Sequence, residues 1–224
     1  MKTPPATLIP NSSSRIKSLL CIAGLVVAAA VVIERSNHQL DYAEAQPRYQ
    51  ATVSRGELIV RSGRYYRSGS STAFTGWMLD RFPDGTVSLR TSVMNGRLNG
   101  ISEGWYTNGV RQLEEYFKEG VADGIRSTWH ANGELRSEGG VRSGLQEGGY
   151  RQWDEKGNLL VEAEFAEGKP DGLSLARFPS GYLKAEALMR HGEIVTRRTY
   201  VDSVQLQPTL RTESAKSAIL TKNP

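Results

Sequence analysis

Four glutamates recur at a spacing of 24 residues, and carboxylates in register are the first candidates for chemistry. They are Glu114, Glu138, Glu162 and Glu186. Carboxylates that lie side by side can bind a cation or share a proton. In a stack of hairpins, however, successive members of this series lie two strands apart, roughly 9 to 10 Å at ~4.8 Å per strand. We therefore expect them to pair with basic residues across strands or to be solvated.

The other patterns that can indicate catalysis or metal binding do not define a site in this sequence. His38, His130 and His191 lack the spacing of metal ligands. Cys21 is the single cysteine, which excludes an intramolecular disulfide and a cysteine-based metal site. Ser102 lies in a Gly-x-Ser-x-Gly stretch, from Gly100 to Gly104, but the glycines of this chain are spaced for turns. No glycine-rich phosphate loop is followed by lysine. The Asp-Gly turns do not follow the nonapeptide pattern of calcium-binding solenoids. The sequence thus predicts no enzyme, no cofactor and no metal.

Three tryptophans share the same 24-residue spacing and are the best candidates for binding a partner. Trp105, Trp129 and Trp153 occupy equivalent positions, and Tyr106 follows the first of them. If they lie on the dry face of a sheet, they form its core. If that face is uncovered, they form an exposed aromatic stripe, and aromatic residues concentrate binding energy at interfaces. Both interpretations remain open, and all four residues are partner-binding candidates.

Glycines define the repeat that must position these side chains. Three glycine series share the period of 24 residues, which indicates a repeat protein. Five full units start at Gly76, Gly100, Gly124, Gly148 and Gly172. A second series, Gly85, Gly109, Gly133, Gly157 and Gly181, follows residues that favour hairpin turns and is predicted to form structural turns. A third series begins at Gly96, and there we expect a longer loop that ends near Gly100.

A strand is predicted after the first turn of every unit. Positions two, four and eight after the turn glycine are mostly apolar, and position five carries the glutamates. A period of two predicts a strand with one dry face and one solvated face. The prediction is an all-β fold, an elongated antiparallel sheet of stacked β-hairpin repeats. Ten strands come from the five units and a pair from the lead-in, with no long helix after residue 40.

One hydrophobic helix is predicted ahead of the sheet, at residues 18–33. Basic side chains precede it in residues 1–17 and acidic ones follow from Glu34, so the positive-inside rule places the rest of the chain outside the cytoplasm. An uncleaved anchor is favoured, while the alanines at 28–30 also suit a signal-peptide cleavage site. A lipoprotein is disfavoured because Cys21 begins the apolar run. We expect the protein to reside in the inner membrane with its repeat domain outside the cytoplasm. If the signal peptide is cleaved, we expect the protein in the periplasm or the medium.

The predicted organisation has five parts. Residues 1–17 form a cytoplasmic n-region, 18–33 the signal-anchor or signal-peptide helix, 34–55 a linker, 56–196 the repeat domain with a lead-in half repeat, and 197–224 a mostly disordered tail. The formal net charge of +4 is peripheral, because the five units hold 14 basic and 18 acidic side chains. An acidic folded part disfavours nucleic-acid binding.

The repeat also carries a resemblance to a known family. An aromatic pair before Asn108-Gly109, the run Leu113-Glu114-Glu115-Tyr116-Phe117 and the closing Asp123-Gly124 resemble the MORN-repeat variant of the YwqK family of antitoxins. This resemblance implies hairpin repeats, no enzymatic activity and a role in binding another protein, including a toxin. We therefore expect a non-catalytic protein-interaction module, exported or anchored through residues 18–33. The alternative is a lipid-binding or envelope-binding structural repeat protein.

Overall fold

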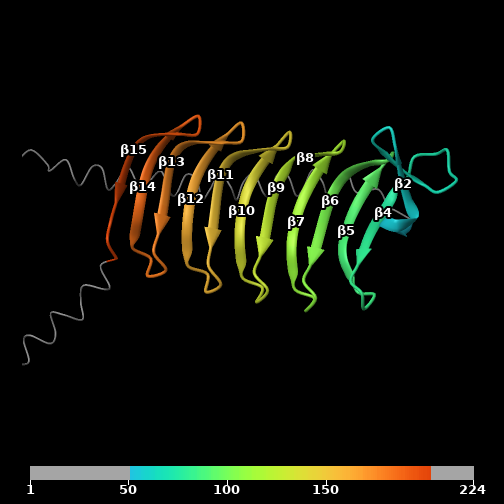
Figure 1. Cartoon of the computed structure of the whole chain (residues 1–224), viewed down its shortest axis with the longest axis horizontal. Coiled ribbons are helices and arrows are strands. Elements are labelled where there is room, and N and C mark those ends of the chain that lie inside the picture. Colours follow the sequence, from blue (N-terminus) through green and yellow to red (C-terminus); the bar gives the residue numbers. More distant parts are fainter. Residues whose placement is uncertain (1–50, 203–224) are drawn as a thin grey trace, which may run out of the picture.

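The computed structural model describes residues 51–202, which form one elongated array of hairpins (Figure 1). The expected n-region, the helix at 18–33 and most of the tail lie outside the described residues. Within residues 51–202, no helix has the length and apolar character needed to cross a membrane.

The lead-in and the five units contribute fifteen strands to the described part of the chain. The lead-in has β1 (Thr52–Ser54), a short 3-10 turn η1 (Arg55–Glu57), β2 (Leu58–Arg61) and β3 (Arg64–Arg67). The units have β4 (Gly76–Arg81), β5 (Val87–Met94), β6 (Arg97–Trp105), β7 (Arg111–Lys118), β8 (Val121–Ala122), β9 (Gly124–Trp129), β10 (Leu135–Arg142), β11 (Leu145–Trp153), β12 (Leu159–Ala166), β13 (Lys169–Arg177), β14 (Leu183–Arg190) and β15 (Glu193–Thr199).

The main sheet runs in the order β1-β4-β5-β6-β7-β9-β10-β11-β12-β13-β14-β15, and the short β8 pairs with β7 off this path. From β4 onward the strand order follows the sequence. The all-β fold and the hairpin array are confirmed. The lead-in pair is present, but β2 and β3 form a separate two-stranded sheet. β1 lies within the residues predicted to form a linker, 34–55, and pairs in parallel with β4. The repeat domain extends past residue 196, since β15 continues to Thr199.

Both connections in each unit are tight turns, so the longer loop expected from Gly96 is wrong. Met94 pairs directly with Arg97, and the two residues between them, Asn95 and Gly96, have φ of 49° and 76°. Positive φ at both central residues is the signature of a type I′ hairpin turn, whose twist matches that of the flanking strands. The strand simply continues through the start of the next unit at Gly100.

Consecutive units are joined along their turns as well as through their strands. In the type I′ turn of each of the five units, the glycine N–H donates to a carbonyl 22 residues earlier, as Gly120 does to Leu98 at 2.8 Å. A side chain 20 residues earlier caps the residue before that glycine; Asn99 Oδ1 accepts from the Glu119 N–H at 3.1 Å. These contacts exist only between neighbouring units, so they fix the 24-residue period in space.

A bulge in each hairpin changes the predicted division of the two faces. Glu103 lies opposite Glu114 and Trp105 opposite Arg111, with a register shift between the two pairs. Position two after the turn glycine therefore shares a face with the glutamates, while positions four and eight lie on the opposite face. The prediction that positions two, four and eight share one dry face is wrong, because a bulge places two residues opposite one.

The core lies at the end of the array where the lead-in packs. Val53, Phe74, Met78 and Val93 form a cluster of buried side chains, and Ala51, Leu58, Tyr65 and Leu98 pack against it. From residue 141 to residue 202 no residue is buried. The first units are therefore built around a core, whereas the last ones are a thin sheet.

Candidate functional site

Large aromatic and basic side chains alternate along one face of the first units. Trp77 of β4, Arg90 of β5, Trp105 of β6, Arg111 of β7 and Trp129 of β9 follow one another across the sheet. The Arg90 guanidinium lies 4.7 Å from the Trp77 ring centroid and 5.9 Å from that of Trp105. The Arg111 guanidinium lies 5.6 Å from the Trp129 centroid. We call these five residues the Trp–Arg ladder and the face that carries them the glutamate face.

Two buried carboxylates hold the arginines of the ladder in place. Glu103 and Glu114 are cross-strand neighbours on β6 and β7, and only 4% and 6% of their surfaces are exposed. Arg111 forms ion pairs with both, at 2.8 Å to Glu103 Oε1. Arg90 donates from Nε to Glu103 Oε2 at 3.1 Å. Two guanidinium groups thus neutralise two buried carboxylates, which satisfies charges that are costly to bury alone.

Solvation was one of the two interpretations of the glutamate series. Glu114 is instead buried, while Glu138, Glu162 and Glu186 are partly exposed. Tyr116 donates from its hydroxyl to Glu114 Oε1 at 3.1 Å. Later members of the series keep the other predicted feature, cross-strand pairing with arginine. Arg177 pairs with Glu162 at 3.2 Å, and Arg198 with Glu186 at 3.3 Å.

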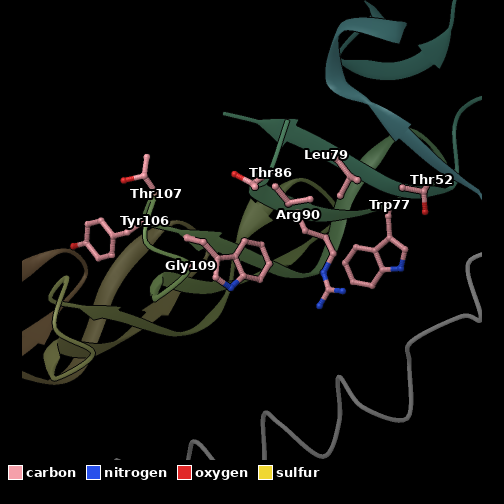
Figure 2. A pocket seen from close by; sticks show the side chains of 10 residues that line it. Thr52, Trp77, Leu79, Thr86, Arg90, Tyr106, Thr107 and Gly109 are labelled. Carbon is pink, nitrogen blue, oxygen red and sulfur yellow. The ribbon is translucent and has the colours of Figure 1, made fainter. Parts of the chain in front are cut away.

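A groove of about 540 Å³ lies over the ladder at the first two units. Its walls include Trp77, Arg90 and Trp105, with Val87 and Tyr106 further along. Figure 2 shows the Trp77 ring and the Arg90 guanidinium projecting on the same side of the sheet. About 43% of the Arg90 side chain is exposed, so a bound molecule could reach both the charge and the rings.

The four predicted partner-binding residues do not have equal roles. Trp105 and Tyr106 line the groove, and Trp129 belongs to the ladder. The Tyr106 hydroxyl also donates to the Trp129 carbonyl at 2.8 Å, which ties two units together. Trp153 lies on the glutamate face beyond the ladder, half-buried, and its carbonyl contacts His130 Nε2 at 3.0 Å. The structure brings together the first three and leaves Trp153 apart.

The predicted turn glycines have the conformation that such turns need. Gly85, Gly109, Gly133, Gly157 and Gly181 have φ of 87°, 80°, 93°, 79° and 87°. In the first of these turns, Asp84 accepts from the Thr86 hydroxyl and N–H, and these bonds lower the pKa of its carboxyl. Asp154 accepts similarly from Asn158, which lowers its pKa. These carboxylates belong to turns and lie outside the ladder.

Sequence reasoning missed four residues of the site: Trp77, Arg90, Glu103 and Arg111. Trp77 is four residues before Arg81, the position equivalent to Trp105, so it breaks the tryptophan period although an even offset keeps it on the same face. Arg111 occupies a position where other units carry aliphatic side chains. A charged residue at an apolar position of one unit was the available signal for a local site.

The arrangement presents aromatic rings and guanidinium groups beside a groove. The two carboxylates are bonded to guanidinium and hydroxyl groups, which leaves them poorly placed to act as a base. In residues 51–202 no group of three or more His, Cys, Asp or Glu side chains is placed to hold a metal ion. No family model matches the chain, and no curated protein matches its sequence.

Proposed function

We propose that this chain is a non-catalytic binding protein, held outside the cytoplasm through residues 18–33, whose Trp–Arg ladder contacts another protein. The observation that carries the proposal is the alternation of tryptophan and arginine over buried carboxylates, open to solvent along a groove. The resemblance to antitoxins makes a toxin one class of partner. The export segment favours a partner in the envelope.

The energetics of interfaces support this use of the ladder. Tryptophan and arginine are enriched among the residues that dominate binding free energy. Here the arginines are already oriented by Glu103 and Glu114, so binding a partner fixes few additional rotamers. A preorganised surface of this kind loses less side-chain entropy on association than a surface of free arginines.

Site-specific photo-crosslinking in cells that produce the full chain tests the proposal. A benzophenone amino acid replaces Val87, which lines the groove on the glutamate face. The matched control replaces Val141, which lines a groove of about 420 Å³ that includes Tyr150 and Gln146 of the opposite face. We expect a discrete protein adduct from position 87 and none from position 141.

A second substitution assigns the adduct to the ladder. Trp105→Ala should lower the yield at position 87 by about tenfold, as expected for a residue that dominates an interface. Trp153→Ala, which lies outside the ladder, should leave the yield unchanged. Equal adducts from both faces contradict the proposal, and adducts to phospholipid alone favour the lipid-binding alternative.

A further inference from the structure

Within residues 51–202, the C-terminal end of the sheet is an open edge with an apolar surface. Six of the ten large apolar side chains that are exposed within the described residues gather there. They are Tyr182, Leu188, Ile194, Val195, Tyr200 and Val201. Exposed apolar surface beside an unpaired strand is typical of an interaction site, because it offers both backbone hydrogen bonds and hydrophobic burial.

The edge strand is long and its inner side is fully engaged. All seven residues of β15 are exposed, and the strand pairs with β14 from Arg190↔Glu193 to Ala185↔Thr199. The Tyr200 N–H donates to the Lys184 carbonyl at 2.9 Å. Since backbone groups alternate in direction along a strand, those of Arg197 and Thr199 point away from β14, toward the open edge.

In the part of the chain that the structure describes, the opposite end of the sheet has no equivalent edge. There the outer strand β1 has three residues, runs parallel to β4, and lies beside the lead-in hairpin of β2 and β3. A head-to-tail stack of copies would need the edge at β15 to pair with the edge at β1 of the next copy, and the short β1 beside the lead-in hairpin does not provide a complementary edge. A two-fold contact needs only one edge used twice, and it closes after two copies.

From these features we infer that two copies of the chain associate through β15, antiparallel, to form one continuous sheet. The charges of the strand fit this arrangement. Glu193 begins the strand, Arg198 lies near its end, and both lie on the glutamate face because they pair with Arg190 and with Glu186 of β14. Antiparallel pairing of two β15 strands brings Glu193 of each copy beside Arg198 of the other, and opposite charges stabilise cross-strand pairs.

Exchange of these charges tests the inference on the full chain in detergent micelles, by light scattering after size exclusion. Glu193→Arg places arginine beside arginine in both halves of the dimer, and Arg198→Glu places glutamate beside glutamate. Each variant alone should raise the dimer dissociation constant by about tenfold. An equimolar mixture should recover dimers that contain one copy of each variant.

Disulfide trapping provides a second readout that does not depend on charge. Thr196→Cys, near the middle of β15, is combined with Cys21→Ser, and mild oxidation should give a covalent dimer. Lys118→Cys on β7 is the control, an exposed site at the end of an interior strand, and should remain monomeric. Circular dichroism checks that each variant folds.

Three results would overturn the inference. The first is a monomer at every concentration, with no disulfide at position 196. The second is a dimer that both charge variants and their mixture leave unchanged, because association then uses another surface. The third is a full-length monomer that dimerises only after deletion of residues 205–224, because the edge is then covered by the chain's own tail. This test is independent of photo-crosslinking at the groove.

Discussion

The first units and the last units share one backbone template but differ in how they are packed. Both have glycines at the same repeat positions, the same two turns and the same hydrogen bonds between units. Among residues 51–202, every buried residue nevertheless lies before residue 141. On the glutamate face the first units carry Tyr116 and Ile125, both nearly fully buried, where the later ones carry Gly140 and Gly149. The repeated positions therefore specify the sheet. The variable positions specify in which units large side chains pack on its face and become buried.

The lead-in strengthens this difference because it covers only one end. It supplies Val53 and Phe74 to the core, and these pack with Met78 and Val93 of the first unit. In a stacked array each unit contacts only its neighbours, so a cap stabilises the adjoining units most. The groove over the Trp–Arg ladder lies next to this cap, and Thr52 of β1 is among the residues that line it.

The largest effect is expected where the lead-in meets the first unit. A Cβ added to Gly76 would lie 2.3 Å from the Ala51 carbonyl oxygen and 2.8 Å from the Phe74 ring. Gly76→Val should therefore destabilise the protein by about 4 kcal/mol through strain and overpacking. Urea unfolding followed by circular dichroism measures it. Gly172→Val, the equivalent change in the fifth unit, should cost less; an equal cost would mean that the cap has no special role.

A truncation in the core should have the next largest effect. Val93 is fully buried, whereas Val141, two units later at the same repeat position, is half-buried. Val93→Ala removes buried methyl groups and leaves a cavity, which should cost about 2 to 3 kcal/mol. Val141→Ala should cost less than about 1 kcal/mol. Thermal unfolding of both variants compares them, and similar losses would contradict the difference between the two ends.

The same substitution at two turn glycines distinguishes the effect of local backbone strain from the effect of position in the array. Gly133 and Gly181 have φ of 93° and 87°, and neither has a close neighbour around an added Cβ. Valine at Gly133 should cost about 1 to 3 kcal/mol through backbone strain. The same substitution at Gly181 should shift the urea midpoint less, because a central defect disturbs two interfaces and a terminal one disturbs one. Small and equal shifts would show that these turns do not require glycine.

The smallest effect concerns a carboxylate in the thin part of the sheet. Desolvation raises the pKa of Glu164 above its ordinary value of 4.5, partly offset by Arg151. A raised pKa in the folded state favours folding below pH 4.5, and this contribution is lost as the pH rises through the folded pKa. At pH 7, Glu164→Gln should therefore raise the urea midpoint slightly. The gain should vanish below pH 4.5, and a variant less stable than the wild type at pH 7 would contradict this assignment.

Much of the fold followed from the sequence because the glycine period has a direct physical cause. Positive φ recurs in both turns, and only glycine and a few polar residues adopt it readily, so the turns are visible as a spacing. The strands between them then follow from the period of two. The lead-in was harder to predict, because β1 has three residues and pairs with a strand 25 residues later.

The candidate site followed only in part. Trp105, Tyr106 and Trp129 were identified because they obey the repeat, while Trp77, Arg90 and Glu103 were not, because each deviates from it. The expectation of one dry and one solvated face also concealed the buried carboxylates. A single bulged residue per hairpin moves position two to the other face. The two-residue period used to predict the strand faces does not include a bulge.

The sequence by itself determined the period, the hairpins and the order of strands, because these depend on local backbone preferences repeated every 24 residues. Only the tertiary structure decided which side chains share a face of the sheet and which units contain buried side chains. Those features depend on cross-strand register, on bulges and on what the lead-in covers. The Trp–Arg ladder exists because five neighbouring strands bring residues from three units onto one face. The distances between these side chains are set by packing across the sheet.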